Sequence, residues 1–195
     1  KGSPRYCSFR QALKIIDSMN YHSYLALQVC GVESVSTVLK GTYASDPELG
    51  ALISQMLEIG GRIQLNFRDF FKSGNYELSD LINLLHRHSD NRFILPYNKS
   101  NEGLFQLLLG YANVIPLVDS SGGKGKVPDF WTNPDPWFQN VRFAGGLGEN
   151  NLAEQIVKIQ TDTGRDYFSL DMESSLRTKD NTFDLAACDR MIRSV

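Results

Sequence analysis

Short apolar runs alternate with amphipathic segments along this chain, and the alternation constrains its fold more than any other feature. The runs are too short for helices and are rich in Val, Ile, Phe and Tyr, so each predicts a β-strand: residues 24–29, 62–67, 92–97, 114–118, 141–144 and 167–170. The segments between them have a helical period and predict helices at residues 49–59, 78–86, 103–109, 152–159 and 183–192. Such alternation implies right-handed crossovers and a parallel sheet with helices outside it, which is an α/β fold.

A flat doubly wound sheet and a closed barrel both fit the alternation, and the strand ends favour the barrel. Polar or glycine residues follow four of the strands, at Asn98, Asp119, Gly145 and Asp171. In (β/α)8 barrels the active site is assembled at that end of the strands. We therefore predict one domain over residues 1–195 with the fold of a (β/α)8, or TIM, barrel. Because six of the eight strands are visible in 195 residues, we expect the first βα units to be missing from this chain. An abbreviated barrel and a barrel completed by an oligomer are the alternatives.

Composition argues against several classes of partner. The chain has 20 Lys and Arg against 22 Asp and Glu, a formal net charge of -2, so it carries no basic footprint for nucleic acid and no polybasic patch for a membrane. It has no apolar stretch of about 18 residues and no signal peptide. Cys7, Cys30 and Cys188 form no Cys-x-x-Cys pair, which predicts neither a disulfide framework nor a metal site. A small-molecule ligand and a cytoplasmic location are therefore expected.

A glycine-rich loop follows the fourth predicted strand and carries the most specific chemical pattern. The strand delivers Asp119 to residues 120–126, where three glycines stand with Lys124 and Lys126. Glycines let backbone N–H groups approach an anion, and the lysines supply positive charge. The spacing matches neither a P-loop nor a dinucleotide-binding fingerprint. The pattern predicts a catalytic acid beside a phosphate site, and an ordinary solvated turn is the alternative.

Three blocks in the second half of the chain stand in an order and spacing typical of one enzyme family. The first is Leu-Val-Asp-Ser at 117–120 with Gly-Gly-Lys-Gly-Lys at 122–126 and Asp-Phe-Trp at 129–131. The others are Ala-Gly-Gly-Leu at 144–147 with Glu-Asn at 149–150, and Leu-Asp-Met-Glu-Ser-Ser at 170–175. These blocks resemble the phosphoribosylanthranilate isomerase family, most strongly over residues 114–195. The resemblance implies a single-domain (β/α)8 isomerase of tryptophan biosynthesis, monomeric or homodimeric, that carries out an Amadori rearrangement of a phosphoribosylated aromatic amine without metal or cofactor.

The resemblance also implies roles for individual residues. Asp119 matches the family's general acid, and Asp171 matches its aspartate that contacts the substrate. Lys126 is expected to point at the phosphate, since a lysine beside Asp119 would hold that carboxyl in its charged form. The phosphate is expected on three loops, at Gly122, Gly123, Gly145, Gly146, Ser174, Ser175 and Arg177.

Two of these positions depart from the family. Ser175 stands where the family has glycine, and Arg177 stands where it has glutamate. A serine restricts the close approach of phosphate to the backbone, whereas an arginine guanidinium offers the phosphate another partner. Phosphate binding is therefore expected in an altered form.

The family's catalytic cysteine allows two interpretations. Ser-Pro-Arg-Tyr-Cys-Ser at 3–8 resembles the segment that follows the family's second strand, so the strand with the cysteine would lie before residue 1. The alternative takes residues 29–33 as that first strand, which makes Cys30 the catalytic thiol but leaves too few strands before Asp119. Strand count favours the first interpretation, in which Cys30 is a small buried residue at a strand end. Cys30 stays a candidate for catalysis.

Two other functions are left open. A catalytically degenerate barrel would bind a phosphorylated ligand or a protein partner, and the altered loop at residues 173–177 favours it. Another phosphosugar enzyme would form a Schiff base through Lys124 or Lys126, a reading that rests on the fold alone. The loop at residues 127–140 carries Trp131, Trp137 and Phe138, which either form a wall for an aromatic ring or pack the loop against the protein.

Overall fold

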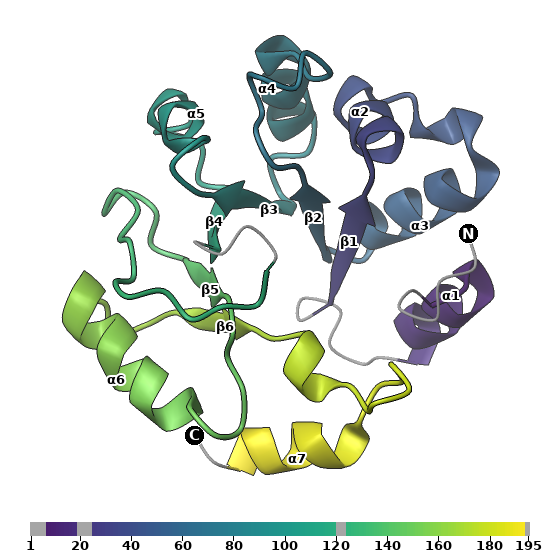
Figure 1. Cartoon of the computed structure of the whole chain (residues 1–195). Coiled ribbons are helices and arrows are strands. Elements are labelled where there is room, and N and C mark those ends of the chain that lie inside the picture. The colour runs from purple at the N-terminus through teal and green to yellow at the C-terminus, as the bar shows by residue number, and fades with distance from the viewer. Residues whose placement is uncertain (1–6, 19–24, 120–123, 194–195) are drawn as a thin grey trace. The chain divides into compact units, whose positions relative to one another are not determined.

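The computed structural model describes residues 7–18, 25–119 and 124–193. Its contacts divide the described chain into two compact units. The N-terminal unit contains residues 7–96 and 100–115, and the C-terminal unit contains residues 97–99 and 116–193. Helices separate successive strands in the chain except between the fourth and fifth strands, where the described residues 124–141 contain no helix (Figure 1). A single domain over residues 1–195 stays a prediction.

The N-terminal unit contains the parallel strands β1 (Ala26–Cys30), β2 (Arg62–Asn66) and, up to Pro96, β3 (Arg92–Tyr97), which neighbour one another in sequence order. Ala26 pairs with Arg62, and Arg62 pairs in turn with Arg92. The helices of this unit are α1 (Phe9–Ser18), α2 (Val32–Lys40), α3 (Pro47–Glu58), α4 (Leu78–Arg87) and α5 (Glu102–Leu107), with a 3₁₀ turn η2 (Tyr43–Ser45).

Burial explains why these segments form these elements. The middle residues of β2 and β3 are buried, with Ile63 and Phe93 fully inside, as expected of parallel strands that are covered on both faces. On α4, Leu81 and Leu85 are buried one turn apart on the same helix face. Apolar periodicity and packing therefore agree in this unit.

The C-terminal unit contains β4 (Val114–Asp119) from Pro116 onward, β5 (Arg142–Ala144) and β6 (Ser169–Asp171), again parallel and in sequence order. Its helices are α6 (Leu152–Thr163) and α7 (Leu185–Arg193), and the 3₁₀ turn η3 (Ser174–Leu176) follows β6. Trp131 and Phe143 are fully buried and meet edge to face, with 5.6 Å between their ring centroids.

The six predicted strands are all present, and their ends lie within two residues of the prediction; residue 24 lies outside the described ranges. The five predicted helices correspond to α3 through α7. The helices α1 and α2 have no predicted counterpart. Much of α2 consists of Val and Thr, which favour strands, but Val35 and Val38 are fully buried. Tertiary packing therefore decides the conformation of α2.

The interpretation of residues 29–33 as one strand is wrong in its second half. β1 ends at Cys30, and α2 begins at Val32. Gly31, between them, has a φ of 93°, a conformation that glycine adopts without the strain of a Cβ. Cys30 is thus a strand-end residue, as the first interpretation of the cysteine expects. Four of the six residues matched to the family at 3–8 fall outside the described residues, which begin at residue 7.

Candidate functional site

Two carboxylates lie in one row across the strands of the C-terminal unit. Asp119, at the end of β4, pairs with Ala144 of β5, and Ala144 pairs with Asp171 of β6. Paired residues of parallel strands point to the same face, and neighbouring strands lie about 4.8 Å apart, so the two Asp Cα atoms are separated by about 10 Å. Asp119 and Asp171 are both half-buried. The row places the two predicted site residues on either side of Ala144.

The loop that leaves β5 is pressed against the loop that leaves β4. Gly146 has a φ of 65°, and a Cβ at this position would lie 2.5 Å from the backbone nitrogen of Val127 and 2.8 Å from the carbonyl carbon of Lys126. Both distances are too short for a real side chain, and the left-handed backbone also favours glycine. Only glycine fits here, because the two backbones are in direct contact.

The same loop also reaches the turn after β6. A Cβ at Gly148 would lie 3.2 Å from the Cβ of Ser175 in η3. The exposed Ser174 precedes this contact, and the half-buried Gly145 precedes Gly146. The structure therefore brings together four of the residues predicted to bind phosphate. Gly122 and Gly123, predicted for the same role, lie outside the described residues.

Asn151 holds the β5 loop from the start of α6. Its side-chain Oδ1 accepts a hydrogen bond from the Gly148 N–H at 2.8 Å, and its Nδ2 donates one to the Gly146 carbonyl at 3.0 Å. An Asn directly before a predicted helix is typical of an N-cap, but this side chain makes no bond to its own helix. It contacts the preceding loop instead, a role that the sequence analysis missed.

The Arg177 side chain makes a hydrogen bond and an ion pair within its own loop. Its Nη1 donates to the carbonyl of Asn181 at 3.0 Å, and its Nη2 lies 3.5 Å from Oε1 of Glu173. The Arg177 side chain is largely buried, whereas that of Glu173 is half-exposed. Binding of phosphate by Arg177 stays a prediction, and it would have to compete with this ion pair.

The lysines of the β4 loop are on the surface. Lys124 and Lys126 are exposed, and Gly125 between them has a φ of 62°. Lys126 precedes Val127, whose backbone nitrogen contacts the β5 loop. Its predicted role toward phosphate is therefore compatible with its place in the chain, and it stays a prediction.

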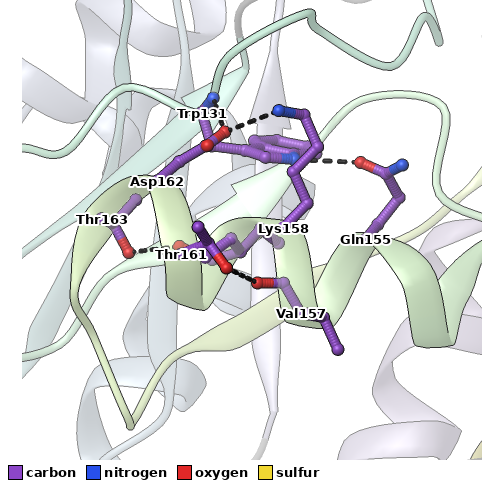
Figure 2. Close-up of polar contacts among 8 residues, drawn as sticks. Trp131, Gln155, Val157, Lys158, Thr161, Asp162 and Thr163 are labelled. Carbon is purple, nitrogen blue, oxygen red and sulfur yellow. Dashed lines mark hydrogen bonds and ion pairs between the residues drawn. The ribbon is translucent and has the colours of Figure 1, made fainter.

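Three side chains of α6 fasten the connection between β4 and β5 at Trp131 (Figure 2). The indole Nε1 of Trp131 donates to Oε1 of Gln155 at 3.0 Å, and its backbone N–H donates to Oδ2 of Asp162 at 2.9 Å. Lys158 reaches the same Asp162 oxygen at 3.0 Å. The bond from the Trp131 N–H, with help from Lys158, lowers the pKa of Asp162 below its ordinary value.

Arg165 fastens the same connection further along. Its guanidinium donates to the carbonyls of Phe138 at 2.8 Å and Pro134 at 3.0 Å, and its burial lowers the pKa of the group. Trp131 and Phe138 are buried, whereas the Trp137 side chain is 54% exposed. Packing of the loop is thus the correct alternative for Trp131 and Phe138, and neither forms a wall for a ligand.

Cys30 lies in the N-terminal unit, at the end of β1. It pairs in register with Asn66 of β2, whose Nδ2 donates to the Cys30 Sγ at 3.6 Å. Cys30 is half-buried, so it is more accessible than the buried residue expected from strand count. Its catalytic role stays a prediction.

Asn101, at the start of α5, was also missed from sequence. It is fully buried, its Oδ1 accepts from the Phe70 N–H at 2.8 Å, and its Nδ2 donates to the carbonyls of Arg68 at 3.1 Å and Pro96 at 3.2 Å. It ties the loop after β2 to the end of β3. Its position before a helix was the available signal, but that signal does not distinguish a helix cap from a loop clamp.

Within the described ranges, no group of three or more His, Cys, Asp or Glu side chains is arranged to hold a metal ion. None of the helices in those ranges is both long and apolar enough to cross a membrane.

No protein-family model and no curated protein matches the sequence. Among solved structures, the chain is similar to monomers generated from the dimeric phosphoribosylanthranilate isomerase of Thermotoga maritima. The similarity covers 98% of this chain and 80% of that chain, with a TM-score of 0.57 and 16% sequence identity. At this identity the similarity shows the fold. The predicted α/β barrel-type fold and the resemblance to this family are therefore confirmed at the level of fold, with six strands in the described residues where a complete (β/α)8 barrel has eight.

Proposed function

We propose that this chain, which has the fold of phosphoribosylanthranilate isomerases, isomerises a phosphoribosylated aromatic amine at the strand ends of its C-terminal unit. The observation that carries the proposal is the arrangement there. Asp119 and Asp171 flank one strand, and the glycine loop after that strand contacts both neighbouring loops. Such a reaction needs an acid and an anchor for phosphate, and these strand ends offer both kinds of group.

Asp119 is the proposed general acid. It donates its proton to the ribose ring oxygen as the bond from that oxygen to C1 breaks, and the lone pair of the amine nitrogen forms a protonated imine at C1. A base then removes the proton from C2, and the electron pair of that bond forms the enol-amine, which becomes the ketone. The reaction is an internal redistribution of hydrogen, so it consumes no oxidant or reductant.

The phosphate anchor consists of the loops after β5 and β6. Gly145 and Gly146 supply a backbone that an anion can approach closely, as glycine-rich turns at strand ends commonly do. The exposed Ser174 and Ser175 add hydroxyl donors from η3. Lys126 supplies positive charge from the loop that contacts Gly146.

Cys30 lies in the N-terminal unit and stays a predicted catalytic residue that is not assigned to the site described above. Its Sγ accepts a hydrogen bond from Asn66, and Cys30 ends a strand, as catalytic residues of barrels do. The role of Asp119 does not depend on the identity of the base, so Asp119 can be tested by itself.

The deciding experiment follows the fluorescence change when freshly prepared phosphoribosylanthranilate is mixed with the purified chain. Asp119→Asn should lower turnover about 100-fold or more, the range for loss of a general acid, and should leave phosphate affinity nearly unchanged. Asp129→Asn is the matched control, because Asp129 is an exposed carboxylate on the connection after the same strand. Absence of turnover by the folded chain, or equal turnover by Asp119→Asn, would refute the proposal.

A second function is favoured by the loop after β6, namely binding of a phosphorylated ligand without reaction. This loop departs from the family in sequence, and its Arg177 guanidinium is held by Glu173 and by the Asn181 carbonyl. This function predicts saturable phosphate binding by a chain that has no isomerase turnover.

A further inference from the structure

The turn from Gly145 to Gly148 has an unusual backbone. Gly145 has a φ of 121° and Gly146 a φ of 65°, and both values lie where residues with a side chain are strained. On one side the turn is stopped by the backbone of residues 126 and 127, and at Gly148 it meets Ser175. Those contacts limit where the turn can lie, but they do not set the direction of its peptide groups.

Asn151 sets that direction. Its two amide groups bond the Gly146 carbonyl and the Gly148 N–H, and its own backbone N–H donates to the Gly148 carbonyl at 3.0 Å. Both hydrogen-bonding functions of the side-chain amide are therefore used. A carboxylate could accept from Gly148 but could not donate to Gly146, so Asn cannot be replaced by Asp without loss.

The two side-chain bonds orient the peptide groups on either side of Leu147. The Gly146 carbonyl and the Leu147 N–H belong to one planar trans peptide, in which they point in opposite directions. Because Asn151 holds the carbonyl, the Leu147 N–H is directed away from Asn151. In the described part of the chain this N–H donates to no protein acceptor. It is an oriented backbone donor.

We propose that Asn151 is a positioning residue that aims the Leu147 N–H at the phosphate of the ligand. The proposal rests on the proposed function, because it assumes that the β5 loop binds phosphate. It adds that the anion-binding geometry of the loop exists before the ligand arrives and is maintained by a side chain that does not touch the ligand. Preorganisation of this kind lowers the ordering cost of binding.

The test uses inorganic phosphate as the probe and the amide resonances of the ¹⁵N-labelled chain as the readout. Asn151→Ala removes both bonds, and Asn151→Asp keeps the bond to Gly148 while removing the one to Gly146. Asn150→Ala is the matched control, because Asn150 is the exposed residue next to Asn151. Phosphate should shift the Leu147 N–H in the wild type. Asn151→Ala should weaken phosphate binding about 2- to 10-fold, the range for one neutral hydrogen bond, and Asn151→Asp at least as much. Asn150→Ala should change nothing.

A second readout tests the clamp, meaning the two side-chain bonds of Asn151 to the glycine loop, without the ligand. Without phosphate, hydrogen exchange at the Gly148 N–H should accelerate in Asn151→Ala and stay slow in Asn151→Asp, which keeps the acceptor and the fold. If the wild type binds no phosphate while this exchange pattern holds, the proposed function fails and the aim of the Leu147 N–H fails with it, but the clamp stands. If the wild type binds phosphate and both Asn151 variants bind it equally well, the positioning role is overturned and the proposed function survives.

Discussion

The loop after β2 and the loop after β5 both follow a parallel strand, but opposite kinds of contact hold them. In the loop after β2, Phe67, Phe70 and Tyr76 are buried, and their ring centroids lie between 5.3 and 5.8 Å apart. In the loop after β5, three of the four residues from Gly145 to Gly148 are glycines. Backbone contacts and the Asn151 amide hold that loop.

The difference indicates where chemistry can take place. A loop filled by its own aromatic rings has no space for a ligand, and its stability comes from burial. A glycine loop offers its peptide groups, and its stability comes from a few directed bonds. Asn101 and Asn151 both precede a helix and show the same contrast. Asn101 is fully buried among three backbone groups of the chain, whereas Asn151 is half-buried and bonds two peptide groups of the glycine loop. The loop after β2 is therefore structural, and the loop after β5 is the better candidate for function.

The largest expected loss of stability comes from removing a buried aromatic ring from the loop after β2. Phe70→Ala should lower the free energy of unfolding by about 3–5 kcal/mol, because Phe70 is fully buried and a cavity would remain. Phosphate affinity of the folded variant should not change. Urea unfolding and a phosphate titration measure the two quantities. Phe71→Ala, at a neighbouring residue that is 49% exposed, should lower the free energy of unfolding far less. A loss of phosphate affinity in Phe70→Ala as large as its loss of stability would contradict the contrast between the loops.

The two loops should also differ in the loss of stability caused by replacing a glycine with alanine. Gly146→Ala places a Cβ against backbone atoms and also forces a left-handed conformation, so we expect a loss of about 2–4 kcal/mol from strain and crowding together. Gly74→Ala, in the loop after β2, has a similar φ of 63° and no heavy atom within 4 Å, so only the conformational cost of about 1 kcal/mol remains. Urea unfolding of both variants measures the difference. Equal losses would contradict the close approach at Gly146.

In the N-terminal unit, we expect the loss of stability at low pH to begin with the protonation of His88. Burial, and then the neighbouring Arg87, lower the pKa of His88 below its ordinary value of 6.5. The unfolded chain therefore binds a proton at a higher pH than the folded chain, and the stability contribution of neutral His88 is lost as pH falls below 6.5. The urea midpoint of the wild type should drop between pH 7 and pH 5.5 more than that of His88→Gln. The variant His86→Gln, at an exposed histidine, should follow the wild type, and identical midpoint changes in all three chains would refute the assignment.

In the C-terminal unit, we expect the corresponding acid effect to be the smallest and to come at lower pH, from Asp162. Its lowered pKa means that the charged form contributes stability above the ordinary value of 3.8, and this contribution is lost as pH falls through the lower folded pKa. Asp162→Asn should reduce the dependence of the urea midpoint on pH between 5 and 3, with the fluorescence of the buried Trp131 as probe. A pH dependence unchanged by the substitution would show that the Trp131 connection does not rely on the charge.

Much of the fold follows from local patterns in the chain. Val, Ile and Phe runs predicted every described strand, because parallel strands that are covered on both faces must be apolar along their length. The ends of those strands then predicted where Asp119 and Asp171 would lie, since parallel strands end on one edge of a sheet. α2 was missed because its Val residues favour strands locally, and the burial of Val35 and Val38 depends on neighbours far away in the chain.

Sequence by itself determined the order of the elements, the α/β class and the placement of glycines and carboxylates at strand ends, because each of these depends on residues within one or two turns or strands. Only the tertiary structure decided what holds the loops in place. The hydrogen bond from Trp131 to Asp162 joins residues 31 positions apart, and the exclusion of a Cβ at Gly146 depends on the backbone of residues 126 and 127. Such contacts depend on packing between segments, and no local pattern of residue types encodes the distance between two backbones.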